Sequence, residues 1–334
     1  MNNEWSDFLQ SRPEDTSGIA SAVCALNDLS HYGLLQVEGE DALQFLQGQL
    51  TNDMRTVSET HSNLSGWCNA KGRMLASFRV LRRGDAYLLQ LPAELMATVI
   101  KRLQMYVLRS KVTLRDASEQ LARCGLSGEC APVLLQNQFP RIPAETNAVV
   151  QQGECSLLRL PGALPRFEVI GPAALLIELW EACESQAVRM GPAFWSLQEI
   201  RAGIPTVRPE TVEAFVPQMA NLQLIDGVSF TKGCYTGQEV VARMQYLGKL
   251  KRRMYLAHVA SDTPPKPGDE LFASGSQSGQ GTGKVVDAQA ADGGYDLLAV
   301  IEIASAEGED VYLGPAGPKL TIRDLPYDFA SDPD

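Results

Sequence analysis

The segment Lys232-Gly233-Cys234-Tyr235-Thr236-Gly237-Gln238-Glu239 is the most informative stretch of this chain. Thr236 is a favourable N-cap residue and Glu239 follows it at the spacing of a capping box, so the pattern predicts a helix that begins here. Tyr235 and Val240 are placed to form a hydrophobic staple across that start. The residues that follow would give the helix one apolar face: Val240, Val241, Met244 and Leu247.

A helix start at this place would make Cys234 reactive. The cysteine would lie near the positive end of the helix dipole and close to Lys232, and both features favour the thiolate over the thiol. Cys234 is therefore the candidate reactive thiol, with Lys232 as its electrostatic partner. A buried structural cysteine in a well-capped turn explains the same pattern, because free cysteine is among the most buried residue types. The residues alone leave both interpretations open.

Length and composition describe an ordinary globular protein. A chain of 334 residues, 45% hydrophobic and 21% charged, is expected to form two or three domains. Its net charge of −11 argues against a surface that coats nucleic acid. The first residues lack the apolar core of a signal peptide, and no apolar run is long enough to span a membrane. We therefore expect a cytoplasmic protein with no membrane partner.

The cysteines do not form a recognisable framework. There are 7 of them, with only 3 histidines, and no CxxC pair occurs. An odd count at irregular spacing does not indicate a set of disulfides. The spacing of Cys124 and Cys130 fits no common zinc motif. The sequence thus predicts reduced thiols and no metal site.

Hydrophobic periodicity predicts strands and helices in mixed order. Strands are expected near residues 33–37, 63–69, 74–82, 86–91, 111–115, 120–126, 155–160 and 166–170. Helices are expected after Glu40-Asp41, from Pro92, near 129–136 and 172–184, and from Pro192. This mixture favours an α+β fold over a regular βαβ repeat.

The character of the chain changes after Gly248. Before that point lies a long irregular stretch, 205–233, and loops of that length tend to be functional. After Gly248, short strand-like runs follow, separated by glycines and prolines, which predicts a small antiparallel β-barrel. Within it, residues 279–284 fit no phosphate-binding motif and predict a hairpin loop. The expected organisation is a loose N-terminal arm at 1–20, a region at 21–247, a barrel at 248–327 and a tail at 328–334.

This part of the chain resembles the signature of the YgfZ family in three consecutive segments: Val228-Ser229-Phe230-Thr231, the octapeptide 232–239 and Val240-Val241-Ala242-Arg243. YgfZ proteins are folate-binding relatives of the glycine-cleavage T-protein, and the mitochondrial iron–sulfur assembly factor of the Iba type is similar. The resemblance extends from about residue 30 to the C-terminus. It implies a T-protein-like folate-binding region of two interleaved subdomains, followed by a small C-terminal antiparallel β-barrel, in a ring-like arrangement.

The resemblance also implies which residues contact tetrahydrofolate or a one-carbon derivative of it. Trp195 matches a folate-contacting tryptophan of the family, although a tryptophan on a helix is most often part of the core. A second such tryptophan is replaced here by Tyr32, which keeps an aromatic face. Gln218 and Asn221 match the family's Pro-Gln-x-x-Asn-Leu turn, and each can donate and accept hydrogen bonds to a pterin edge. A hydrogen-bonded loop bracket explains these two residues equally well.

One departure from the T-protein pattern concerns chemistry. Where aminomethyltransferases carry Gly-Gly-x-x-Asp-Asp, this chain has Lys71-Gly72-Arg73-Met74-Leu75-Ala76. Transfer of a one-carbon unit needs a positioned acid or base, which Leu75-Ala76 cannot supply. Arg201 also stands where the T-protein pattern has glutamate. T-protein activity is therefore not expected.

Three functions follow from these observations. The favoured one is a folate-binding protein that supports iron–sulfur cluster assembly or maintenance and thereby tRNA thiolation, with iron–sulfur enzymes or cluster-assembly proteins as partners. The alternatives are a folate-dependent one-carbon transferase and a non-catalytic folate sensor or scaffold. Direct tRNA binding rests on basic residues for which a solvated strand face is the commoner explanation: Arg79, Arg82, Arg83, Arg243, Lys249, Lys251, Arg252 and Arg253.

Overall fold

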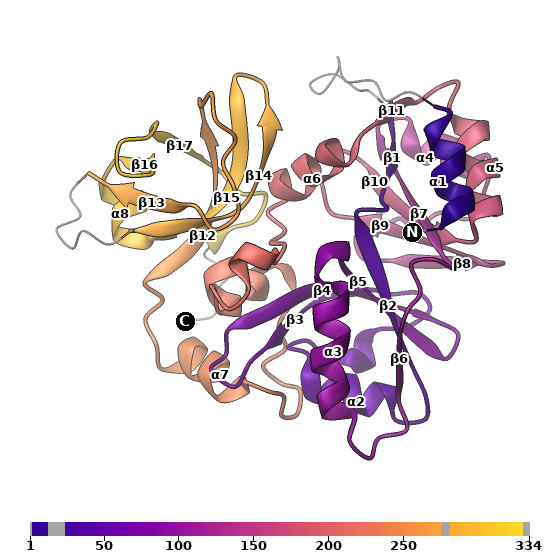
Figure 1. The fold of residues 1–334 in the computed structure, drawn as a ribbon, viewed down its shortest axis with the longest axis horizontal. Helices are drawn as coiled ribbons and strands as arrows, with labels where there is room; N and C mark the ends of the chain where they lie inside the picture. The colour runs from indigo at the N-terminus through magenta and orange to yellow at the C-terminus, as the bar shows by residue number, and fades with distance from the viewer. Residues whose placement is uncertain (1, 13–23, 275–280, 330–334) are drawn as a thin grey trace. The chain divides into compact units, whose positions relative to one another are not determined.

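The computed structural model describes residues 2–12, 24–274 and 281–329. The chain forms two compact units, each assembled from segments that alternate along the sequence. The first unit consists of Met1–Leu46, Met54–Asn63 and Phe78–Trp195, and the second of Gln47–Asp53, Leu64–Ser77 and Ser196–Asp334. Helices and sheets occur in both (Figure 1), so the predicted α+β class is confirmed.

The first unit contains a six-stranded sheet, here called the first sheet, in the order β11-β1-β7-β10-β9-β8. Neighbouring strands are antiparallel except β1 and β11, which are parallel. Its strands are β1 (Cys24–Asp28), β7 (Ala122–Gly128), β8 (Val149–Gln152), β9 (Cys155–Leu160), β10 (Arg166–Gly171) and β11 (Val188–Met190). Three helices pack against one face of this sheet: α1 (Asn3–Gln10), α4 (Ala131–Gln136) and α5 (Ala173–Cys183).

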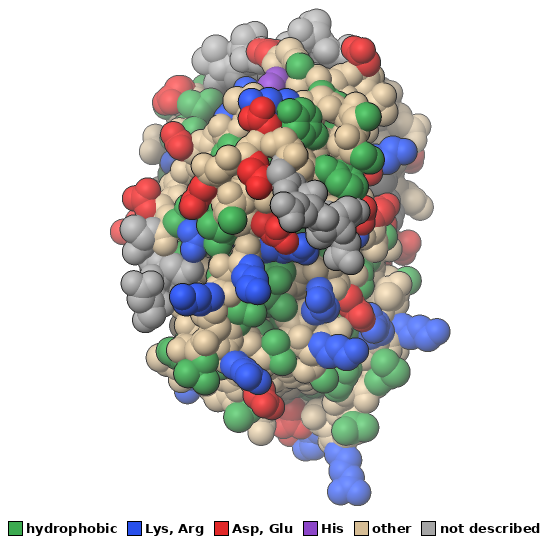
Figure 2. Space-filling view, turned by 90° about the vertical axis from the view of Figure 1, so that its left-hand side faces the viewer, with side chains coloured by type: hydrophobic (Ala, Val, Ile, Leu, Met, Phe, Trp, Pro, Cys, Tyr) green, Lys and Arg blue, Asp and Glu red, His purple; other side chains and the backbone are tan. Residues whose placement is uncertain are grey.

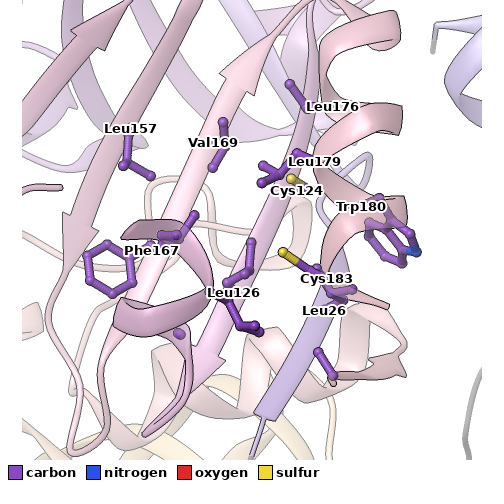
Figure 3. Close-up of a cluster of buried hydrophobic side chains, with 14 of the residues drawn as sticks. Leu26, Cys124, Leu126, Leu157, Phe167, Val169, Leu176, Leu179, Trp180 and Cys183 are labelled. Carbon is purple, nitrogen blue, oxygen red and sulfur yellow. The ribbon is translucent and has the colours of Figure 1, made fainter. Parts of the chain in front are cut away.

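The alternation of strand residues builds the core on that face. Phe167 and Val169 of β10 lie opposite Leu126 and Cys124 of β7, so all four side chains point the same way. Figure 3 shows them in one cluster with Trp180 and other apolar side chains of α5. Burying one large apolar side chain contributes about 1.5–3 kcal/mol, so this cluster is a major source of stability for the first unit.

A second sheet has the order β3-β4-β5-β2-β6. Its strands are β2 (Tyr32–Glu38), β3 (Asn63–Cys68), β4 (Met74–Arg83), β5 (Ala86–Pro92) and β6 (Thr113–Asp116). The helix α2 (Ala42–Gln49) follows β2, and α3 (Met96–Val107) follows β5 after a 3₁₀ turn at Ala93–Leu95. Pro92 therefore precedes a helical segment, as predicted.

The second unit carries the stretch predicted to be irregular. It follows α6 (Pro192–Arg201), whose last residues belong to this unit. The stretch contains three 3₁₀ turns, Pro209–Thr211, Pro217–Ala220 and Leu222–Ile225, and leads to α7 (Gln238–Tyr246).

The predicted small antiparallel barrel is present after α7. Its strands are ordered β16-β13-β14-β15-β12-β17, and every paired neighbour is antiparallel. A bridge between Tyr312 and Lys319 links the two ends of this curled sheet. The elements are β12 (Arg252–Val259), β13 (Glu270–Ala273), β14 (Gly283–Ala291), β15 (Gly294–Glu302), α8 (Ile303–Gly308), β16 (Val311–Leu313) and β17 (Leu320–Arg323). Of the loop expected at 279–284, residues 279 and 280 lie outside the described residues.

The compact units are divided differently from the domains predicted at 21–247 and 248–327. Residues 196–247 belong to the same unit as the barrel. Buried polar contacts explain this grouping, because Arg208 pairs with Asp287 at 2.9 Å and Asn221 donates to the Met254 carbonyl oxygen at 2.8 Å. The predicted tail at 328–334 is described only for its first two residues, of which Phe329 packs against the barrel core.

The expectation of a loose N-terminal arm is wrong for residues 3–10, which form α1. Asn2 caps this helix by accepting a hydrogen bond from the Trp5 amide. Trp5 is completely buried, donates from Nε1 to the Asp28 carboxylate at 2.9 Å, and lies edge-on to Trp180 at 5.5 Å. The polar composition of the segment does not indicate this helix, which the buried Trp5 anchors to the core. Residues 13–20 of the expected arm lie outside the described residues.

The expectation that all thiols are reduced is also wrong. Cys24 of β1 and Cys130, which precedes α4, form a disulfide with Cα atoms 5.7 Å apart. The two residues are separated by 106 positions, so nothing in their sequence spacing indicates the pairing. The other five cysteines are free, and of these only Cys234 is exposed.

None of the helices in the described part of the chain combines the length and the apolar character needed to cross a bilayer. Nor do the described residues contain a group of three or more His, Cys, Asp or Glu side chains arranged to hold a metal ion.

The position of Trp5 predicts that α1 is an integral part of the first unit. Trp5→Ala should lower the free energy of unfolding by about 3–5 kcal/mol, because it removes a buried aromatic side chain and leaves a cavity. Asp7→Ala, an exposed change on the same helix, should stay within about 0.5 kcal/mol of the original chain. Urea unfolding followed by circular dichroism measures both. Equal stability of the two variants would contradict the packing of α1.

Candidate functional site

The cysteine segment lies in the second unit, and its helix begins later than predicted. The first residue of α7 is Gln238, and the N-cap is Gly237 with φ +85° and no side-chain cap. The predicted capping box of Thr236 and Glu239 is therefore wrong. The reason is a tertiary contact: the Thr236 amide donates to the Gly48 carbonyl oxygen at 3.3 Å, which holds Thr236 in the preceding loop.

A close backbone approach requires glycine at position 237. A Cβ atom there would lie 3.1 Å from the Cα of Gly72 and would collide with the carbonyl oxygen of Asn69. Gly72 has φ +70°, and a Cβ on it would lie 2.9 Å from the Cβ of Val240. The start of α7 therefore packs against the turn of residues 69–73, which connects β3 to β4 (Figure 1).

Lys232 is buried, with 5% of its surface exposed. Its Nζ donates to the carbonyl oxygens of Leu50 at 2.6 Å and Asn52 at 2.8 Å. It also lies 5.1 Å from the ring centre of Tyr235. Charge-assisted hydrogen bonds of this kind offset the desolvation of the ammonium group. Lys232 therefore braces the cysteine segment against residues 50–52, while its role as electrostatic partner of Cys234 stays a prediction.

Cys234 is exposed, which excludes the alternative of a buried structural cysteine. Its neighbours Lys232 and Tyr235 are both buried, so the backbone is anchored on either side of an accessible thiol. In the same unit, burial raises the pKa of Cys68 to about 12 and makes that thiol unreactive. Accessibility therefore distinguishes Cys234 as the thiol that can react with a molecule from solution.

A second candidate site lies on the face of the first sheet opposite α1, α4 and α5. Along β10, Arg166 and Glu168 point to this face, opposite Ser127 and Gly125 of β7. Asn27 of β1 pairs with Gly125 from the other side. We call Asn27, Arg123, Ser127, Arg166 and Glu168 the polar face. All five side chains are buried.

Trp195 and Tyr32, the two aromatic residues predicted to contact folate, lie in one apolar cluster of the first unit. The Trp195 ring lies on Gly125, where a Cβ atom would be 2.7 Å from Cη2. The Arg166 guanidinium lies 4.4 Å from the centre of the same ring, in a cation–π contact. The structure thus brings the two predicted aromatic residues together and places Trp195 beside the polar face, next to Asn27 and Glu168 in the strand register.

Several atoms of the polar face lack hydrogen bonds within the described part of the chain. They are both side-chain amide atoms of Asn27, the hydroxyl of Ser127 and Nη1 of Arg123. Burial lowers the pKa of Arg123, although the nearby Glu168 and Asp28 carboxylates act in the opposite direction. Since an unpaired buried polar group costs about 1–3 kcal/mol, a cluster of them indicates a place where a polar ligand supplies the partners.

Gln218 and Asn221 lie in the second unit, where both make structural hydrogen bonds. The Gln218 Nε2 donates to the Val241 carbonyl oxygen of α7 at 2.6 Å. The Asn221 Nδ2 donates to the Met254 carbonyl oxygen of β12 at 2.8 Å. These contacts give both side chains the role of loop brackets. Their predicted contact with folate is not tested by this geometry.

Sequence patterns did not identify Asn27, Arg123, Gly125 or Glu168 as site residues. The only available signal was the alternation in β10, where Arg166 and Glu168 are interleaved with Phe167 and Val169. Such alternation normally indicates a strand with one face in solvent. The alternation indicates a ligand-binding site only when both faces of the sheet are known to be buried.

The bracing role of Lys232 leads to a stability prediction. Lys232→Met keeps most of the side-chain volume but removes the donors to Leu50 and Asn52, and should lower the free energy of unfolding by about 2–4 kcal/mol. Lys249→Met, on an exposed lysine in the same unit, should change it by less than about 0.5 kcal/mol. Chemical denaturation of both variants measures the difference. An undiminished stability of Lys232→Met would show that these two hydrogen bonds do not hold the segment.

Comparisons with known proteins show which proteins this chain resembles in sequence and in fold. Residues 15–159 match the model of the GCVT N-terminal domain. The chain is similar in fold to the glycine cleavage system aminomethyltransferase T from Bartonella henselae, with a TM-score of 0.75 and 19% identity over 92% of this chain and 87% of that one.

Two curated relatives, each named tRNA-modifying protein YgfZ, match nearly the whole chain. The protein from Colwellia psychrerythraea (strain 34H) is 34% identical over 92% of this chain and 94% of its own length. The protein from Serratia proteamaculans (strain 568) is 30% identical over 96% of this chain and 97% of its own length. On these matches, the chain belongs to the YgfZ family.

Proposed function

We propose that this chain is a tetrahydrofolate-binding YgfZ-type protein that supports iron–sulfur cluster assembly or maintenance and thereby tRNA modification by thiolation. The name of its relatives, tRNA-modifying protein YgfZ, supports the link to tRNA. The fold shared with an aminomethyltransferase supports the link to folate. The observation that carries the folate part is the polar face with its unpaired buried atoms beside Trp195.

The chemistry of the polar face fits a reduced pterin ring. Such a ring has a flat surface and an edge that carries both N–H donors and acceptor atoms. Asn27 and Ser127 can donate and accept, Arg123 can donate, and the Glu168 carboxylate can accept. Trp195 supplies an adjacent aromatic surface. A bound tetrahydrofolate would contribute a reduced ring that can carry a one-carbon unit, and these residues would hold and orient it.

Cys234 is the proposed reactive thiol. It is exposed, and the buried Lys232 and Tyr235 hold the backbone around it. An accessible, positioned thiol can act on a partner protein that carries an iron–sulfur cluster or assembles one. The proposed partners are therefore iron–sulfur enzymes or cluster-assembly proteins. This role does not require direct contact with tRNA.

The residues at the start of β4 argue against aminomethyl transfer as the function. Leu75 and Ala76 occupy the positions at which the T-protein pattern has two aspartates, and both are buried. Their alkyl side chains cannot exchange a proton with a folate nitrogen. This favours the role in cluster maintenance over the one-carbon transferase.

The unpaired hydroxyl of Ser127 allows folate binding at the polar face to be tested. Ser127→Ala should weaken tetrahydrofolate binding by about fivefold or more, because a hydrogen bond to the ligand is lost. The stability of the ligand-free protein should stay the same or rise, because an unpaired buried hydroxyl is removed. Isothermal titration calorimetry under anaerobic conditions and thermal unfolding measure the two effects.

The matched control is Ser156→Ala. Ser156 lies on the same face of the first sheet, but its hydroxyl already donates to the Gln151 side chain at 2.7 Å. This variant should lose about 1 kcal/mol of stability and bind tetrahydrofolate normally. If Ser127→Ala binds folate with unchanged affinity, the polar face is not the folate site.

A complementation experiment tests the proposed role of the thiol. Cells that lack their own YgfZ-type protein receive the original chain, Cys234→Ala or Thr231→Ala at matched protein levels. The readout is the activity of an iron–sulfur enzyme that thiolates tRNA. We expect full rescue by the original chain and by Thr231→Ala, an exposed change in the same segment. Rescue by Cys234→Ala should be at least about tenfold lower, because alanine has no thiolate. Equal rescue by Cys234→Ala would leave a folate sensor or scaffold as the function.

A further inference from the structure

We propose that the second unit contains another ligand site, a small pocket that binds a compact anion with an apolar body. The pocket has a volume of about 270 Å³ and is lined mainly by Arg73, Phe215, Met219, Arg252, Lys284 and Val300. All of these residues belong to the second unit, whereas the polar face proposed to bind folate belongs to the first. This inference therefore does not depend on the proposed function.

Part of the pocket wall is apolar. Phe215 is buried just before the 3₁₀ turn Pro217–Ala220, which contributes Met219. Val300 of β15 adds a further apolar surface. Such a wall removes water from a bound group and strengthens any electrostatic contact at its edge. A ligand with only charge and no apolar body would leave this surface unused.

Three cationic side chains complete the lining, and Arg73 is the most available of them. The Arg73 Nη1 donates to the carbonyl oxygens of Glu213 at 3.2 Å and Ala214 at 2.8 Å. Backbone oxygens thus orient its guanidinium, and no carboxylate among the described residues pairs with it. Because a guanidinium has five N–H donors, Arg73 keeps donors for an anion in addition to those two bonds.

The other two cations are only partly neutralised. Arg252 pairs with Glu302 at 2.9 Å, and Lys284 lies 3.8 Å from Glu270. Both pairs are half exposed, so each contributes little to stability and leaves room for exchange with a competing anion. Three cations and two such carboxylates leave a net positive charge around the pocket.

The net charge of the whole chain is −11, so the excess of cationic side chains around the pocket is a local feature. Figure 2 shows one face on which Lys and Arg side chains gather around hydrophobic side chains. A pocket of this size accommodates a single ring or a short chain rather than a large cofactor. Arginine forks recognise phosphate and carboxylate equally well by geometry, so the shared ligand chemistry is an oxyanion attached to a small apolar group.

Calorimetric titration of the full chain with phenyl phosphate, benzoate and benzyl alcohol tests this site. We expect at least one of the two anions to bind and the neutral alcohol not to bind. The stronger anion then identifies the natural ligand as a phosphate ester or a carboxylate. Arg73→Gln and Lys284→Gln should each weaken binding by about tenfold, as expected for loss of one charge-assisted contact.

Two further variants separate the pocket from general surface charge. Lys251→Gln removes the same charge from an exposed residue next to Arg252 that does not line the pocket, and should change the affinity by less than about twofold. Ala214 also lines the pocket, so Ala214→Phe fills it while keeping all three cations and should abolish binding. Binding of neither anion, equal losses in Lys251→Gln and Lys284→Gln, or normal binding by a folded Ala214→Phe variant would each overturn the proposal.

Discussion

The burial of both faces of the first sheet is the constraint on which the candidate folate site depends. Phe167 and Val169 must point toward α5 to complete the apolar core, and the pleat of β10 then turns Arg166 and Glu168 to the opposite side. On an exposed sheet those charges would meet water. Here they are buried beside Trp195, so polar atoms are held where only a ligand or another protein group can pair with them.

The cysteine segment is held by contacts between parts of the chain that are distant in sequence. Lys232 reaches the carbonyl oxygens of residues 50 and 52, and Gly237 packs against the turn of residues 69–73. These three segments belong to the same compact unit, which explains why that unit is interleaved along the chain. This turn contacts two features of the unit. Gly72 packs against the start of α7, and Arg73 lines the proposed anion pocket.

Local patterns predicted the larger elements well and the smallest ones poorly. The helix at 172–184 and the strands at 155–160 and 166–170 were predicted close to their observed bounds, because each has a clear period of its own. The strand β1 was not predicted, since Ala25, Leu26 and Asn27 are buried in succession and show no alternation. The predicted capping box of Thr236 and Glu239 is absent because the Thr236 amide is paired with the Gly48 carbonyl oxygen. A tertiary hydrogen bond here overrides the local preference of threonine for the N-cap position.

The amino-acid sequence by itself determined the α+β class, the C-terminal barrel, the resemblance to the YgfZ family and the cysteine segment, because periodicity and short motifs are properties of neighbouring residues. Only the tertiary structure decided that Cys234 is exposed, that Cys24 is bonded to Cys130, and that α1 is held by Trp5. It also decided that Asn27 and Glu168 flank Gly125, on which the Trp195 ring lies, and that all three side chains are buried. The physical reason is that exposure and pairing depend on what packs against a residue from distant parts of the chain.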